Sequence, residues 1–315
     1  MSEEERKAAA IDIGSNSCRL LIASKEDGEI KREYFAMKIT KLSEGIETEG
    51  NATAKLLTEP ARQRTFAALQ SFKKEIEKQD ISRVKAVGTS ALREVDNAQD
   101  FCRKIENRLS IPVEIISGQQ EAKLVLAGVN SFPRRDVQLV IDIGGGSTEI
   151  IRQKGKSRVQ AVSLKMGAVR FTERYISEPG SLITQNEQND IVQVVRELLR
   201  EKASKLDNIS SYNDVFGVGG TITSLAAIAE EMEIYNSEIV ENYSLSRSRI
   251  EKICRMLAGK NLEERKQVPG LQPERADIIV SGILILLAFM KYFDYSRLQV
   301  SDRGILYGMI SHYLL

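Results

Sequence analysis

The stretch Ile11-Asp12-Ile13-Gly14-Ser15-Asn16-Ser17 recurs about 130 residues later as Ile141-Asp142-Ile143-Gly144-Gly145-Gly146-Ser147-Thr148. Apolar residues precede each copy and a β-rich stretch follows it, so each copy predicts a β-hairpin with a short polar turn. The backbone N–H groups and hydroxyls of such a turn can bind an anion. Two such turns, each preceded by an aspartate, predict a phosphate and metal site shared by two similar halves.

Length and composition narrow the class of protein. A chain of 315 residues is long enough for two domains with ample cores. Its net charge of +1 predicts neither nucleic-acid nor membrane binding. Three widely spaced cysteines indicate reduced thiols in a cytoplasmic protein. We expect no signal peptide, and the longest apolar run, residues 278–290, is too short to span a bilayer and predicts a buried core helix.

The hydrophobic periodicity predicts alternating strands and helices. In the first half we expect strands at residues 30–39, 84–87 and 113–116 besides the hairpin. We expect helices at 59–78, at 97–109 and from Ser117 onward. In the second half we expect helices at 187–206, 222–230 and 303–315, and strands at 214–218 and 298–301. The alternation is typical of an α/β fold with mixed sheets.

Three glycine-containing turns and three carboxylates predict the anion site. The glycines Gly144, Gly145 and Gly146 let consecutive N–H groups converge on phosphate oxygens. Ser147 and Thr148 follow them, and a third turn, with Gly219, Gly220 and Thr221, follows a predicted strand. Asp12 and Asp142 end their strands, and Glu149 lies just across the second hairpin. Carboxylates beside a polyanion favour a cation between them, and we expect Mg²⁺. Turn-capping aspartates are the structural alternative.

Glu121 is the candidate catalytic carboxylate. Ser117 and Gln120 have capping-box spacing, which places Glu121 in the first turn of a helix, where the helix dipole favours its anionic form. An ionised carboxylate in a phosphate site could activate water, although an ordinary dipole-stabilising glutamate has the same pattern. Arg93, after Thr89 and Ser90, could bind an anion, and so could Lys165, Arg170 and Arg275; solvated basic residues are the alternative for the last three.

Together these motifs resemble the exopolyphosphatase/guanosine pentaphosphate phosphatase (Ppx/GppA) family. The resemblance spans almost the whole chain, in the family's order, at residues 10–17, 88–93, 117–122, 141–149, 163–170, 217–221 and 274–277. It implies two actin-like, ribonuclease H-like domains of the ASKHA superfamily with a cleft between them. We expect these domains at residues 1–125 with 303–315, and at 126–302. We expect no C-terminal HD-like domain, which longer members carry.

The resemblance also implies the roles of the site residues. Glu121 matches the family's catalytic glutamate, Asp142 and Glu149 match its Mg²⁺-associated carboxylates, and Asn16, Ser17, Arg93 and the second turn match phosphate ligands. The implied substrates are inorganic polyphosphate and guanosine penta- or tetraphosphate, and the implied assembly is a homodimer. The expected activity is exopolyphosphatase.

Four alternatives remain at this point. The same cleft could hydrolyse pppGpp to ppGpp, or the protein could bind these ligands as a sensor without catalysis. A small-molecule kinase is disfavoured because Glu121 suits water activation. An actin-like filament protein is consistent with the fold alone.

Overall fold

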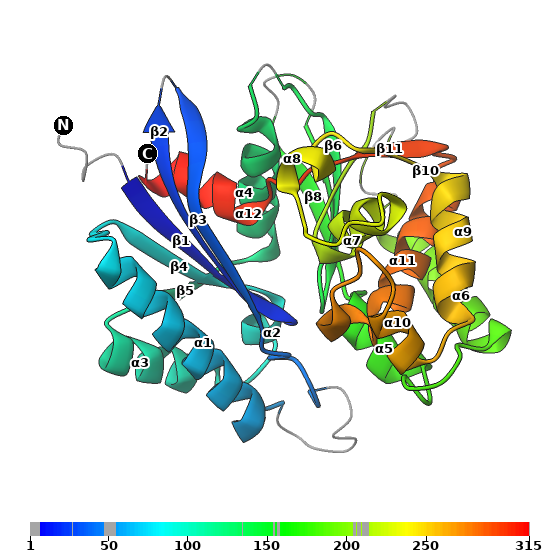
Figure 1. Cartoon of the computed structure of the whole chain (residues 1–315), viewed down its shortest axis with the longest axis horizontal. Helices are drawn as coiled ribbons and strands as arrows, with labels where there is room; N and C mark the ends of the chain where they lie inside the picture. Colours follow the sequence, from blue (N-terminus) through cyan, green and yellow to red (C-terminus); the bar gives the residue numbers. More distant parts are fainter. Residues whose placement is uncertain are drawn as a thin grey trace. The chain divides into compact units, whose positions relative to one another are not determined.

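The structure is a computed structural model that describes residues 7–26, 28–46, 55–133, 135–153, 155, 158–203, 206, 209 and 214–314 (Figure 1). The chain divides into two compact units, of which the first comprises Met1–Asp136 with Arg303–Leu315 and the second comprises Val137–Asp302. Each unit has its own mixed sheet and its own hydrophobic core.

The first unit is built on a five-stranded sheet of order β3-β2-β1-β4-β5. Its strands are β1 (Lys7–Ile13), β2 (Ser17–Glu26), β3 (Glu29–Ile39), β4 (Val84–Gly88) and β5 (Val113–Ile115). Only β2 is antiparallel to the rest, because β4 pairs parallel with β1 and β5 pairs parallel with β4. The predicted first hairpin is confirmed, with Asp12 opposite Arg19 in the register.

Helices cover the first sheet. Those of this unit are α1 (Glu59–Lys78), α2 (Ser90–Arg93), α3 (Ala98–Leu109), α4 (Gly118–Asn130), α12 (Ile305–Met309) and the π-helical turn η5 (Ile310–Leu314). The predicted bounds of α1 are confirmed: Thr58 caps its N-terminus, a proline stands in its first turn, and Leu69, Phe72 and Ile76 are buried. The α1 and α3 helices pack together over the alternate strand residues Ala9 and Ile11.

The helices α4 and α12 touch backbone to backbone. A Cβ atom added to Gly128 of α4 would lie 1.9 Å from the carbonyl oxygen of Gly304, and one added to Gly308 of α12 would lie 1.8 Å from that of Leu124. Only glycine permits so close an approach. The helix that carries Glu121 is thereby fixed to α12, which also packs against β1 and β2.

The second unit repeats the same sheet pattern with one more strand. Its six-stranded sheet has the order β10-β11-β9-β6-β7-β8. The strands are β6 (Leu139–Ile143), β7 (Thr148–Arg152), β8 (Gln160–Leu164), β9 (Phe216–Val218), β10 (Ser244–Ser246) and β11 (Arg297–Val300). Here β6-β7-β8 forms an antiparallel meander, while β9 and β11 run parallel to β6.

The core of the second unit forms around the predicted apolar helix. This helix, α11 (Ile279–Tyr292), is buried at every residue from Ile279 to Met290, so its prediction as a core helix is confirmed. The other helices are α5 (Ala168–Tyr175), α6 (Gln185–Lys202), α7 (Gly220–Ala229), α8 (Ser237–Val240), α9 (Arg247–Ala258), α10 (Leu262–Lys266) and the 3₁₀ turn η4 (Pro273–Arg275). The sequence predicted α6 to extend to residue 206; it is described as a helix to Lys202, and residues 204–205 lie outside the described residues.

One arginine is fully buried among backbone carbonyl groups. Arg265 of α10 has no exposed surface and donates to the carbonyl oxygens of Leu257, Pro179 and Ser181. These bonds join α10 to the end of α9 and to the segment that precedes α6. Burial lowers the pKa of Arg265, and the negative charge of the nearby Asp277 offsets part of this decrease.

The expected α/β architecture is confirmed. The strands of the first unit have the spatial order 3-2-1-4-5 with only the second strand antiparallel, which is the ribonuclease H-like order that the resemblance implied. The second unit has the order 3-2-1-4-6-5, which is the same arrangement with one extra strand, β10, paired antiparallel to β11 at the edge. None of the described helices has the length and apolar character needed to cross a membrane.

Candidate active site

The turn of the first hairpin uses carbonyl groups within the protein, while two of its N–H groups have no acceptor in the described ranges of the chain. The carbonyl of Asn16 accepts from the N–H groups of Thr40 and Lys41, and that of Ser15 accepts from Ser43. Within the described part of the chain, the N–H groups of Ser15 and Asn16 have no acceptor. The side-chain amide of Asn16 is buried, and neither its Oδ1 nor its Nδ2 has a partner there.

The aspartate before this turn is ion-paired. Arg19 donates from Nε and Nη2 to Asp12 Oδ2, at 3.0 and 2.5 Å. Asp12 Oδ1 is buried and has no partner in the described residues. One carboxylate oxygen of Asp12 is therefore engaged by a cation of the protein, and the other remains for water or a ligand.

The glycine turn of the second hairpin repeats this arrangement. Both turns are closed by the same bond, from Gly14 N–H to Ser17 and from Gly144 N–H to Ser147, at 3.0 Å in each case. The first N–H groups of α5 donate to the carbonyls of Gly144 and Gly145, and Arg170 Nε donates to that of Gly146 at 2.7 Å. The turn's N–H groups, those of residues 145–147, have no acceptor among the described residues. Both turns can thus offer N–H groups to an anion.

The hydroxyl groups predicted for phosphate binding fall into two groups: those of the threonines lie inside the protein, and those of the serines do not bond to other described residues. Thr148 is fully buried and donates to the carbonyl of Met166 at 2.6 Å, so its hydroxyl is used inside the protein. Thr221 is also buried, and its side chain packs against Gly282 of α11. The hydroxyls of Ser17 and Ser147 have no hydrogen-bond partner in the part of the chain that is described.

Asp142 and Glu149 face each other across the second hairpin. They are direct partners in the antiparallel register of β6 and β7, so their side chains lie on the same face of the sheet, as the sequence predicted. Glu149 is 1% exposed, and its Oε1 accepts from Ser163 Oγ at 2.7 Å. Mg²⁺ is commonly held by one or two carboxylates and keeps several waters, so this pair suits it. No cluster of three or more metal-binding side chains occurs among the described residues.

The third glycine turn lies against Asp142. Gly219 has a φ of +93°, and a Cβ atom there would lie 2.7 Å from Asp142 Oδ1. At Gly220, the first residue of α7, an added Cβ would overlap the guanidinium of Arg275, which Gln272 also contacts at 3.0 Å. The second unit therefore brings the glycine turns, two carboxylates and the predicted basic residue Arg275 together.

The first unit places Glu121 against Arg93. Ser117 and Gln120 form the predicted capping box at the start of α4, and Glu121 in its first turn is 9% exposed. Arg93 Nη1 donates to Glu121 Oε2 at 2.6 Å and to the carbonyl of Ile116 at 3.0 Å. The predicted base is thus ion-paired with a predicted phosphate ligand.

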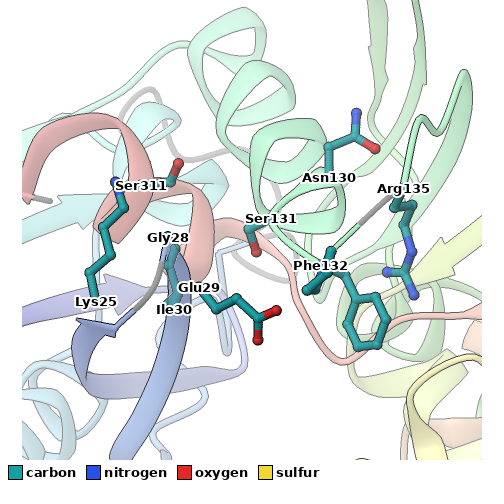
Figure 2. A pocket seen from close by; sticks show the side chains of 10 residues that line it. Lys25, Gly28, Glu29, Ile30, Asn130, Ser131, Phe132, Arg135 and Ser311 are labelled. Carbon is teal, nitrogen blue, oxygen red and sulfur yellow. The ribbon is translucent and has the colours of Figure 1, made fainter.

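A cavity of about 410 Å³ lies at the other end of α4 (Figure 2). Part of it is lined by Glu29 and Ile30 of the hairpin β2-β3, by Asn130 at the end of α4, by Phe132 just after that helix, and by Ser311. Asn130 is about 14 Å from Glu121 along the helix axis, at 1.5 Å per residue. None of the predicted site residues lines this cavity, so it is separate from the candidate active site.

Sequence reasoning missed two partners of the site. Arg19 follows Asp12 by seven residues, which is the spacing that correctly placed Glu149 opposite Asp142. The same spacing could have identified Arg19. Ser163 was missed because strand β8, which places it beside Glu149, was not predicted.

Comparison with known proteins agrees with these motifs. The family model for the Ppx/GppA phosphatase family matches residues 21–315. The chain is 34% identical to a bifunctional 3-dehydroquinate synthase/phosphatase of Fusobacterium nucleatum, over 96% of this chain, and spans only 46% of that relative. It resembles the crystal structure of the Aquifex aeolicus family member, with 30% identity, a TM-score of 0.78 and coverage of 97% of this chain and 96% of the other.

A second solved structure is similar in fold over the same extent. An exopolyphosphatase from Cytophaga hutchinsonii matches with 25% identity, a TM-score of 0.86 and 98% coverage of both chains. The family model covers residues 21–315, and the first motif extends the match to residue 10. The chain therefore belongs to the Ppx/GppA phosphatase family.

Proposed function

We propose that this protein is a Mg²⁺-dependent exopolyphosphatase that releases orthophosphate from the ends of polyphosphate. The observation that carries the proposal is the shared design of the two hairpin turns. Their carbonyls are bonded within the protein, while their N–H groups at residues 15–16 and 145–147 have no acceptor among the residues that the structure describes. Turns of this kind bind phosphate oxygens. The exopolyphosphatase named for Cytophaga hutchinsonii supports the choice of substrate class.

Each proposed role follows from a position in its own unit. In the first unit, Asn16 and Ser17 bind phosphate oxygens, and Glu121 accepts a proton from the attacking water. In the second unit, the N–H groups of Gly145, Gly146 and Ser147 bind phosphate. Because Thr148 and Thr221 direct their hydroxyls into the protein, we propose that these two threonines shape the turns. Phosphoryl transfer needs mainly positioning and neutralisation of charge, which such groups supply.

Asp142 and Glu149 are the residues proposed to hold Mg²⁺. They face each other across β6 and β7 and would otherwise place two negative charges next to a polyanion. Bound Mg²⁺ would neutralise phosphate charge in the transition state. Asp12 is already paired with Arg19, so only its Oδ1 is left for water or a metal-bound water.

Orthophosphate release from polyphosphates of defined length, with and without Mg²⁺, tests the proposal. Glu121→Gln should lower the rate by about 10²–10⁴-fold, the usual effect of losing one acid–base group. Glu114→Gln is the matched control, because Glu114 is a second glutamate of this unit that pairs with a cation, Lys85, at 2.5 Å. Undiminished turnover by Glu121→Gln, or turnover that needs no Mg²⁺, would overturn the corresponding role.

The same assay separates the neighbouring functions. A larger kcat/KM for pppGpp than for polyphosphate would identify a guanosine pentaphosphate phosphohydrolase. Tight binding of either ligand with no release of phosphate would identify a sensor. The 3-dehydroquinate synthase named in the Fusobacterium nucleatum relative is not part of this proposal, because this chain spans less than half of that protein.

A further inference from the structure

Arg93 is placed to act on the catalytic base. The same nitrogen, Nη1, donates to the carboxylate of Glu121 and to the carbonyl of Ile116, just before the helix that carries Glu121. The side chains of Arg93 and Glu121 are 20% and 11% exposed, so the pair is largely shielded from water. A charged hydrogen bond in such a setting is short and directional.

The contact restricts where the carboxylate can point. A glutamate in the first turn of a helix can rotate about three side-chain bonds, and solvent would normally let it sample several rotamers. Here Oε2 is held by a guanidinium that is itself anchored to the backbone at residue 116. Nε and Nη2 of Arg93 have no partner among the described residues. Arg93 therefore uses only one of its three side-chain nitrogens, Nη1, to hold Glu121.

We propose that Arg93 is a positioning residue that orients Glu121 toward the attacking water. This inference rests on the proposed function and adds to it, because the resemblance implied only a phosphate-binding role for Arg93. If the proposal is correct, most of the effect of Arg93 on turnover is exerted through Glu121. A purely phosphate-binding role would instead act on substrate affinity and be independent of Glu121.

A double-mutant cycle separates the two roles. Orthophosphate release is measured for the unaltered protein, Arg93→Gln, Glu121→Gln and the double variant, and the affinity for inorganic tripolyphosphate is measured alongside. We expect Arg93→Gln to lower kcat about 10²-fold or more, with KM changed less than threefold, on the scale of a misplaced catalytic group. In the Glu121→Gln background the same substitution should change kcat less than threefold.

Arg64→Ala is the matched control for folding. Arg64 also joins a backbone carbonyl, that of Thr40, to a glutamate, Glu44, at 2.8 and 2.6 Å. It should leave kcat within twofold of the unaltered protein. The Tm of Arg93→Gln should also be similar to that of Arg64→Ala. A loss of activity in Arg93→Gln then cannot be explained by unfolding of the variant.

The outcomes distinguish this inference from the function on which it rests. Additive losses in kcat, or a large rise in KM with unchanged kcat, would overturn the positioning role and leave the phosphatase proposal standing. Absence of phosphate release by the unaltered protein would overturn both. Partial recovery of Arg93→Gly by added guanidinium, seen only when Glu121 is present, would support the inference directly.

Discussion

Gly128→Ala tests whether the contact between α4 and α12 fixes the helix that carries Glu121. The added Cβ would lie 1.9 Å from the carbonyl oxygen of Gly304, whereas an ordinary contact needs about 3.4 Å. The two helices must therefore separate locally by about 1.5 Å. The obstacle is backbone and not a flexible side chain, so rotation of a rotamer cannot relieve it.

The expected magnitude follows from two opposing effects. Overpacking of a close contact costs about 1–3 kcal/mol, while replacing a helical glycine by alanine stabilises a helix by about 1 kcal/mol. Because the obstacle is backbone, we take the upper part of the overpacking range, about 2–3 kcal/mol, and expect a net loss of about 1–2 kcal/mol. For a unit of about 150 residues, 1 kcal/mol corresponds to about 2–4 °C in Tm, so Tm should fall by about 2–8 °C.

Calorimetry provides the assay, and Gly304→Ala provides the control. An added Cβ at Gly304 meets no atom within 4 Å, although this residue lies in the same helix contact. Its Tm should change by no more than about 2 °C. Should Gly128→Ala prove as stable as Gly304→Ala, the close approach of the two helices would be refuted.

Three further predictions concern buried or capped groups. Arg265→Met removes a donor from three carbonyl groups, of which only that of Leu257 keeps another donor within the described residues, the N–H of Lys260, so we expect a loss of about 3 kcal/mol in the free energy of unfolding, measured by denaturant titration; a loss below about 1 kcal/mol would contradict it. Burial raises the pKa of Glu187, but hydrogen bonds from Ser177 and Thr184 outweigh it and lower the pKa to about 2. The ionised Glu187 therefore stabilises the fold above pH 4.5, and this stabilisation is lost as the pH falls toward 2. The difference in the free energy of unfolding between the unaltered protein and Glu187→Gln should disappear over that range. Burial also raises the thiol pKa values to about 12, 11 and 12, so a thiol reagent at pH 8 should label the native protein slowly and the unfolded protein at all three positions, Cys18, Cys102 and Cys254.

The sequence predicted best the features that depend on local rules. The bounds of α1 follow from an apolar repeat at spacings of three and four. The pairing of Asp142 with Glu149 follows from the length of one hairpin turn. The capping box of α4 likewise needs only residues three apart, Ser117 and Gln120.

Features that depend on tertiary contacts were not predicted. The burial of Arg265 cannot be predicted from the charged stretch Leu262–Lys266, because the three carbonyl groups that accept from it lie up to 86 residues away in the sequence. Arg93 meets Glu121 across 28 residues, which include the helix α3 and the strand β5. Thr148 follows the glycine turn as a phosphate ligand would, yet its hydroxyl is taken by Met166, which only the strand after it brings near.

The repeated hairpin shows why two similar halves need not have the same chemistry. In both units the residue seven positions after the aspartate is its partner across the hairpin. The first unit has Arg19 at that position, which balances the charge of Asp12 within the protein. The second has Glu149 at that position, so two carboxylates face each other there, and these are the residues that we propose to hold Mg²⁺. In our proposal, this one difference at a fixed register position separates a turn that binds an anion alone from a turn that binds an anion with Mg²⁺. Arg19→Glu should then give the first turn the carboxylate pair of the second, and a gain of Mg²⁺ binding, measured by calorimetry in the absence of phosphate, would be the expected result. Unchanged Mg²⁺ stoichiometry in a folded Arg19→Glu variant would show that a facing carboxylate pair is not sufficient for the site.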